Sequence, residues 1–219
     1  MTAPFLDRTD AGRRLAARLM RFRDRQPVVL ALPRGGVAVA HPVALALGAP
    51  LDLVLVRKIG TPFQPELAAG AVAEGETPEL VINEAICEAV PPDWLKAQIV
   101  RQTEEIARRR ALYLGSRARV PVAGRTAIVI DDGIATGATM RAALRAVRKA
   151  RPARLVLAVP VAPRETIGRL RAEADEVVCL TAPELFGSVG SFYAAFPQLD
   201  DARVVELLND AAAAVRRQP

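Results

Sequence analysis

The chain has 219 residues, of which 51% are hydrophobic and 25% charged, and its formal net charge is +6. That length is enough for one α/β domain with a full core, and the composition is typical of a globular protein. No apolar run reaches the ~18–20 residues that a membrane span needs, and residues 1–8 carry no signal-peptide core, which favours a cytoplasmic protein with no membrane partner.

The numbers of cysteine, histidine and aromatic residues disfavour several kinds of site and partner. The chain has two cysteines, without CxxC spacing, and a single histidine, His41. A disulfide framework, a zinc site and a Ser-His-Asp or Cys-His hydrolase are therefore disfavoured, and His41 is interpreted as structural or solvent-facing. Most of the positive charge is arginine, which pairs well with phosphate. Aromatic residues make up only 4% of the chain, which offers little for base stacking and disfavours nucleic acid as a partner.

Strands alternate with helices through most of the chain. Short apolar runs predict buried strands over 28–32, 51–56, 126–130, 154–160 and 176–180. Apolar residues at helical spacing predict helices over 10–25, with Thr9 or Asp10 as N-cap, and over 37–47, 93–116, 140–150, 164–174 and 200–217. Between them, a Gly- and Pro-rich stretch with short strands at 67–73 and 79–82 indicates a flap that closes over a substrate.

This alternation predicts a three-layer α/β/α sandwich around a mostly parallel sheet. We expect a single domain over 1–219, with a core at about 28–180, a flap at about 57–118 and a C-terminal hood and helix at about 183–219. In such sheets, ligands bind beyond the carboxyl ends of the strands. The two most distinctive loops, 32–36 and 131–139, both follow such ends, so the site is expected there.

The loop 131–139 has the residues of a phosphate cradle. Its glycines and small side chains allow backbone N–H groups to converge on an anion, and the helix that follows adds its N-terminal dipole. The hydroxyls of Thr136 and Thr139 can donate to phosphate oxygens, and Thr139 can also cap the helix. The carboxylates of Asp131 and Asp132 repel phosphate but suit sugar hydroxyls or a Mg²⁺ shell. The loop therefore predicts a site for a phosphorylated sugar.

The segment 129–139 resembles the phosphoribosyl-pyrophosphate-binding signature of type I phosphoribosyltransferases, with two apolar residues, two acidic ones, and a Thr-Gly pair before a final threonine. The resemblance implies that Asp131 and Asp132 hold the ribose 2′- and 3′-hydroxyls, and Mg²⁺ only indirectly, through those hydroxyls or water. It assigns the 5′-phosphate to Ala135, Thr136, Gly137, Ala138 and Thr139. It also implies sheet order 3-2-1-4-5-6, with an antiparallel third strand near 79–82, and a homodimer.

The same resemblance places pyrophosphate at the first loop and at the end of the second strand. In the first loop the candidate residues are Arg34, Gly35 and Gly36, and family members often have a non-proline cis peptide there. At the end of the second strand the candidates are Arg57 and Lys58. With Asp131 and Asp132, Arg34 and Lys58 form the expected catalytic set. The alternatives are a plain βα turn at the first loop and a solvated edge at the second strand.

Other positions are less constrained. Arg109, in the long helix, either supplies a cation to the closed site or lies on a solvated face. Phe192 and Tyr193 either stack on a planar acceptor base or pack the C-terminal helix onto the core. Ala135 stands where some purine-salvage members have an aspartate that acts as a base, so no general base is identified.

The leading hypothesis is Mg²⁺-dependent transfer of ribose 5-phosphate from phosphoribosyl pyrophosphate to a nitrogenous, base-like acceptor, with release of pyrophosphate. The second is a regulatory protein that senses phosphoribosyl pyrophosphate or nucleotides, with the net charge as its support for nucleic-acid binding. The third is hydrolytic or phosphotransfer use of the same cradle, which lacks a Walker-type Gly-Lys-Thr/Ser sequence.

Overall fold

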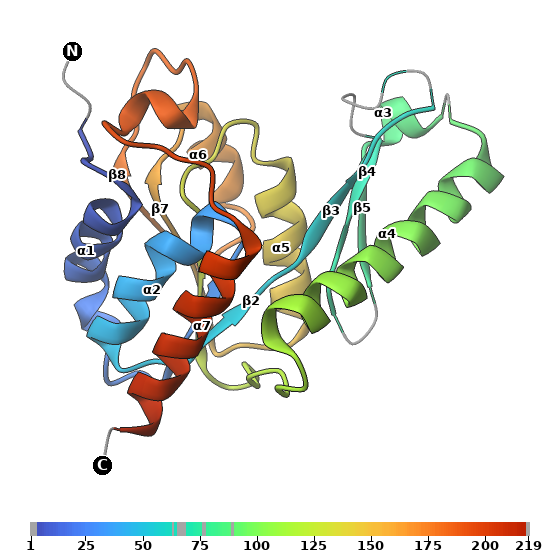
Figure 1. Cartoon of the computed structure of the whole chain (residues 1–219). Helices are drawn as coiled ribbons and strands as arrows, with labels where there is room; N and C mark the ends of the chain where they lie inside the picture. Colours follow the sequence, from blue (N-terminus) through green and yellow to red (C-terminus); the bar gives the residue numbers. More distant parts are fainter. Residues whose placement is uncertain (1–3, 63, 65–68, 76–77, 89, 218–219) are drawn as a thin grey trace.

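The structure, a computed structural model, describes residues 4–62, 64, 69–75, 78–88 and 90–217. Its centre is a five-stranded sheet in the order β2-β1-β6-β7-β8, and every pair of neighbouring strands is parallel. The strands are β1 Pro27–Ala31, β2 Leu51–Leu53, β6 Thr126–Ile130, β7 Arg154–Val161 and β8 Glu176–Thr181. The predicted α/β class with a mostly parallel sheet is confirmed (Figure 1).

Helices cover both faces of this sheet. One face packs against α1 (Arg8–Leu19), α2 (Gly35–Leu47) and α7 (Asp201–Arg216), and the other against α5 (Ala138–Lys149) and α6 (Arg164–Leu170). Side chains alternate between the faces, so that Val29 and Ala31 join the first layer while Val28 and Leu30 join the second. Because both faces are covered, β1 and β6 are buried along their whole length and are apolar at nearly every position.

A second, antiparallel sheet projects from the core with a long helix beside it (Figure 1). It contains β3 Val56–Ile59, β4 Gly70–Ala73 and β5 Glu79–Ile82 in that order, followed by α3 Glu84–Cys87 and α4 Pro92–Leu114. We call β3 to α4 the flap. The expected sheet order needs correction, because β5 pairs with β4 in this second sheet and does not extend the parallel one. The predicted strand 51–56 is likewise divided between β2 and β3.

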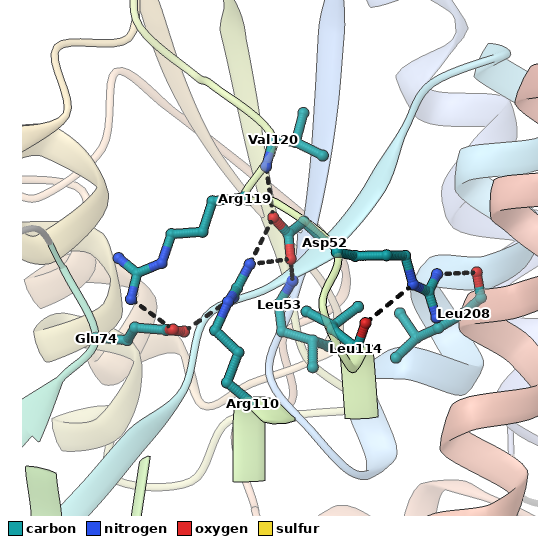
Figure 2. A network of polar contacts seen from close by, with 9 residues as sticks. Asp52, Leu53, Glu74, Arg110, Leu114, Arg119, Val120 and Leu208 are labelled. Carbon is teal, nitrogen blue, oxygen red and sulfur yellow. Dashed lines mark hydrogen bonds and ion pairs between the residues drawn. The ribbon is translucent and has the colours of Figure 1, made fainter. Parts of the chain in front are cut away.

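A buried ion network fixes the root of the flap to the core (Figure 2). Asp52, in β2, accepts hydrogen bonds from Arg110 Nη2 at 3.0 Å and from the backbone N–H of Val120 at 2.8 Å. Glu74, after β4, accepts from Arg110 Nη1 at 3.2 Å and from Arg119 Nη2 at 2.8 Å. Burial raises the pKa of Glu74 although both arginines oppose the shift. One α4 arginine therefore joins a core strand to the flap sheet.

The terminal segments that the structure describes, which begin at residue 4 and end at residue 217, lie outside the central sheet. Asp7 caps α1 by accepting from the N–H of Asp10 at 2.7 Å, so the expected caps Thr9 and Asp10 are wrong. His41, in α2, has Nε2 2.7 Å from Oδ2 of Asp210 in α7, as a structural histidine would. The 3₁₀ helices are η1 Met20–Phe22 and η2 Val189–Phe192.

Among the helices described, none combines the length and apolar character needed to cross a bilayer.

Candidate active site

The loop between β6 and α5 is open to solvent where a phosphate would bind. Gly137 is the N-cap of α5 and adopts φ 83°, a left-handed conformation that favours glycine. Thr166 Oγ1 holds the loop from α6 by donating to the carbonyl of Ala135 at 2.8 Å. Thr136 is exposed and Thr139 half-buried. Because the first N–H groups of a helix have no intrahelical partner, this end is suited to an anion.

The capping role expected for Thr139 is wrong. No side chain caps α5, and Thr139 lies in the first turn of the helix, after Ala138. The hydroxyl of Thr139 is therefore not committed to a cap, and its predicted role as a phosphate donor stays a prediction.

The acidic pair is held by its own backbone and by a distant arginine. The N–H of Asp132 donates to Asp131 Oδ1 at 2.8 Å, and Arg8 Nε donates to Asp132 Oδ2 at 2.8 Å. Burial raises the pKa of Asp131 well above its ordinary value, and the neighbouring charge of Asp132 raises it further. Burial and the neighbouring negative charge therefore both favour the protonated form of Asp131.

The first loop packs directly against the acidic pair. A Cβ atom at Gly35 would lie 1.8 Å from Asp132 Oδ2, and one at Gly36 would lie 2.8 Å from the carbonyl oxygen of Ile130. Only glycine allows this approach. The peptide bond between Pro33 and Arg34 is cis, as the resemblance suggested. The two loops that the sequence singled out thus meet at the carboxyl ends of neighbouring strands, β1 and β6.

Residues 5–8 near the N-terminus and residues 186–197 near the C-terminus lie together over one side of Asp132, and we call these two segments the hood. Phe5 pairs with Tyr193 in an isolated parallel bridge, and the Tyr193 hydroxyl donates to the backbone carbonyl of Asp132. Arg8 also donates to the carbonyl of Pro197 at 2.8 Å, and its guanidinium lies 3.6 Å from the ring centroid of Phe196. The sequence reasoning missed Arg8, because nothing near it in the chain distinguishes it from the arginines that follow.

This arrangement has known relatives. The family model described as "Phosphoribosyl transferase domain" matches residues 6–196. The chain belongs to the phosphoribosyl transferase domain family. A curated protein of Mycobacterium tuberculosis, provisionally named a phosphoribosyl transferase and recorded from two strains, is 46% identical over 209 residues. That match covers 94% of this chain and 47% of the relative, so the chain spans about half the length of the curated relatives it matches.

The chain is also similar to solved structures. The crystal structure of TT1426 from Thermus thermophilus is 43% identical, has a TM-score of 0.81, and covers 94% of this chain and 98% of its own. The AQ2163 protein from Aquifex aeolicus is 12% identical with a TM-score of 0.50, covering 85% of this chain and 84% of its own, and shows likeness of fold alone.

In this phosphoribosyl transferase domain, Arg57 and Arg109 have partners outside the loop 131–139, and Lys58 faces solvent. Arg57 is in β3 and donates to Gln102 Oε1 at 3.2 Å, while Lys58 beside it is exposed. Arg109 Nε donates to Glu105 Oε1 at 2.8 Å. No hydrogen bond or ion pair among the described residues joins any of the three to the loop 131–139. Their ligand roles stay predictions.

Arg34 is closer to the cradle and has a partner on α7. Its Nη1 lies 3.8 Å from Asp201 Oδ1, the atom that also accepts from the Tyr113 hydroxyl at 2.6 Å. The side chain of Arg34 keeps 35% of its surface exposed, so it is accessible to an anion. Burial and the bond to Asp201 raise the pKa of Tyr113 to about 12, so the hydroxyl remains a donor at neutral pH.

Phe192 and Tyr193 pack among other aromatic side chains, whereas the packing alternative placed them between the C-terminal helix and the core. Tyr193 is 5% exposed, and its ring centroid lies 5.4 Å from that of Phe5 and 4.9 Å from that of Phe196. Phe192 is half-buried and stacks on Phe186 with 5.5 Å between centroids. The ring of Tyr193 therefore supports the hood, and its hydroxyl fixes the loop that carries Asp132.

The acidic pair suits a loosely held Mg²⁺ ion. Within the described part of the chain, no three His, Cys, Asp or Glu residues gather closely enough to form a metal site. Mg²⁺ often keeps several waters and binds proteins through one or two carboxylates together with substrate phosphates. Asp131 and Asp132 are carboxylates of this kind, and their expected indirect contact with Mg²⁺, through ribose hydroxyls or water, stays a prediction.

Proposed function

We propose that this chain transfers ribose 5-phosphate from phosphoribosyl pyrophosphate to a nitrogenous, base-like acceptor and releases pyrophosphate, with Mg²⁺ as cofactor. The observation that carries the proposal is the contact between the glycine loop and the acidic pair, beside the open N-terminus of α5. A sugar phosphate placed there would meet phosphate donors at one end and hydroxyl acceptors at the other. Family membership supports the same reaction type.

The proposed roles follow the order of groups in the substrate. Residues 135–139 bind the 5′-phosphate, and Asp131 and Asp132 accept hydrogen bonds from the ribose hydroxyls. Arg34 and the backbone at Gly35 and Gly36 bind the pyrophosphate, and Arg57, Lys58 and Arg109, near the root of the flap, are proposed as further cations for it. Mg²⁺, when bound, neutralises charge on the pyrophosphate.

The proposed chemistry rests on positioning and electrostatics. The bond between C1 of the ribose and the pyrophosphate oxygen breaks, and the pyrophosphate leaves with the electron pair. The acceptor nitrogen forms the new bond to C1 and loses a proton to solvent, because no protein base is identified beside the cradle. Charge develops on the leaving group, where Arg34 stabilises it.

The direct test is pyrophosphate release from phosphoribosyl pyrophosphate and Mg²⁺ across a panel of purine, pyrimidine and other nitrogenous acceptors. The double variant Asp131→Asn/Asp132→Asn should lose at least ~10²-fold in kcat/KM, the scale of lost charge stabilisation. Unchanged turnover in that variant would remove the assigned roles. Chelation of Mg²⁺ should abolish turnover, and added Mg²⁺ should restore it.

The regulatory alternative predicts a different outcome of the same experiment. Ligand binding by calorimetry without turnover of any acceptor would indicate a sensor. Ligand-dependent binding of nucleic acid with a steep salt dependence would indicate a sensor that also binds nucleic acid. A homodimer and a cytoplasmic location belong to the proposal as well, and sedimentation and fractionation test them.

A further inference from the structure

Arg8 stands out because it is a buried arginine bonded to the acidic pair. Its side chain is 10% exposed, and 124 positions separate it from its partner Asp132. Buried arginine is uncommon unless it is paired with a carboxylate. The carboxylate that pairs with Arg8 belongs to Asp132, which is proposed to bind ribose. It is not a carboxylate of the same helix, α1.

The guanidinium of Arg8 is restrained on three sides. Its Nε donates to Asp132 Oδ2, its Nη1 donates to the carbonyl of Pro197, and its central carbon lies over the ring of Phe196. Because Phe196 and Pro197 belong to a segment other than that of Asp132, Arg8 cannot follow Asp132 if that side chain rotates. The carboxylate is therefore held in one orientation before a ligand arrives.

The rest of Asp132 is restrained as well. Its backbone carbonyl accepts from Tyr193, and its N–H donates to Asp131. The space beside Oδ2 is closed by Gly35, where even a Cβ atom would overlap the carboxylate. Both backbone polar groups of Asp132 and one of its carboxylate oxygens are thus held by residues of the loop or of the hood.

We infer that Arg8 is a positioning residue for ribose binding, acting through Asp132, and that the hood thereby belongs to the sugar site. This inference rests on the proposed function. Arg8 contributes by fixing the orientation of the carboxylate through Oδ2, which positions the other oxygen, Oδ1, to accept from a ribose hydroxyl. A pre-set acceptor binds its ligand more tightly than one that must be ordered on binding.

The experiment measures the affinity for ribose 5-phosphate with Mg²⁺ by calorimetry, on the full chain. Arg8→Gln should weaken binding about tenfold or more, the effect of losing one charge-assisted hydrogen bond, and Arg8→Lys should be intermediate. Arg14→Gln is the matched control. Arg14 lies on the same helix, bonds to Asp10 and the carbonyl of Pro4, and does not touch Asp132. Its affinity should stay within about twofold of wild type.

A double-mutant cycle separates positioning from general support of the fold. If Arg8 acts through Asp132, adding Arg8→Gln to Asp132→Asn should weaken binding little beyond Asp132→Asn alone. Full additivity would overturn the inference, as would equal affinities of Arg8→Gln and Arg14→Gln. Tighter binding by Arg8→Gln would show that Arg8 blocks the site, which also overturns it. Wild-type protein that binds no ribose 5-phosphate would remove the proposed function itself, a result distinct from these.

Discussion

Gly35 lies so close to Asp132 that a Cβ atom on the glycine would stand 1.8 Å from the carboxylate oxygen Oδ2. Gly35→Ala must therefore displace either the carboxylate or the first loop. We expect a loss of about 1–3 kcal/mol in the free energy of unfolding, the usual range for overpacking, together with weaker binding of ribose 5-phosphate. Urea unfolding and calorimetry measure the two effects.

The matched control is Gly168→Ala in α6, where a Cβ atom would meet nothing within 4 Å. Alanine is favoured over glycine inside a helix by about 1 kcal/mol, so this variant should be at least as stable as wild type and bind equally well. Gly35→Ala with wild-type affinity would show that the contact between the two loops does not shape the site.

The two threonines of the cradle offer a second test. Thr136→Val and Thr139→Val remove hydroxyl donors while keeping side-chain shape. Each should weaken ribose 5-phosphate binding by about 1.5–3 kcal/mol, the range for hydrogen bonds to charged groups. Calorimetry with ribose 5-phosphate gives the values, and ribose without phosphate should show no such difference. Thr103→Val, on α4, serves as control because its hydroxyl donates within the helix to the carbonyl of Ile99.

The stability of the protein should depend on pH through Asp131. Burial and the charge of Asp132 raise the pKa of Asp131 in the folded protein above its ordinary value of 3.8. Its contribution to stability is therefore complete below that ordinary pKa and is lost as pH rises through the raised one. Asp131→Asn cannot ionise and keeps an oxygen that accepts from the N–H of Asp132. It should unfold at a higher temperature than wild type at pH 8, with the gap closing toward pH 4.

Asp132→Asn provides the contrasting control for that experiment. It weakens the ion pair with Arg8, which is buried, and should lower the melting temperature at pH 8. A thermal scan series between pH 4 and pH 9 on all three proteins distinguishes the cases. If Asp131→Asn were less stable than wild type at every pH, the cost assigned to the buried carboxyl would be wrong.

Arg110 should be the most sensitive charged residue at the root of the flap. Arg110→Met leaves Asp52 and Glu74, each with a side chain only 5% exposed, without their shared partner. Removing one member of a buried ion pair typically costs about 3–5 kcal/mol in the free energy of unfolding. Arg108→Met, two positions away on an exposed face and paired with Glu105, should leave the urea midpoint close to that of wild type.

Much of the core could be read from the sequence because its signals are local. The apolar runs at 28–32 and 126–130 coincide closely with β1 and β6, since a strand buried on both faces must be apolar throughout. The loop 131–139 is recognisable because a phosphate cradle needs small residues, glycines and hydroxyls in a fixed order, and the loop 32–36 because two glycines follow an arginine. The sheet order implied by the family resemblance makes these two strands neighbours, and the structure confirms that β1 and β6 are adjacent.

The errors arise where distant contacts decide. Strand 79–82 has no local signal for the sheet it joins, and pairing with β4 places it in the flap. The sequence predicts Thr139 as the N-cap of α5, but Gly137, in a left-handed conformation, is the N-cap, and the helix begins at Ala138. Arg8 lies among similar arginines, and only the folded chain brings it to Asp132. Each of these depends on a partner far away in the sequence or on backbone geometry.

The step from β2 to β3 limits how the flap can move. Two buried residues, Val54 and Leu55, separate these strands, and neither is free: the N–H of Val54 donates to the carbonyl of Ala31, and the carbonyl of Leu55 accepts from the N–H of Glu74. The root of the flap is therefore rigid and does not act as a hinge. Any bending toward the sugar must occur nearer the tip of the flap. Amide hydrogen exchange should be slowest at Val54 and Glu74 and faster toward the tip.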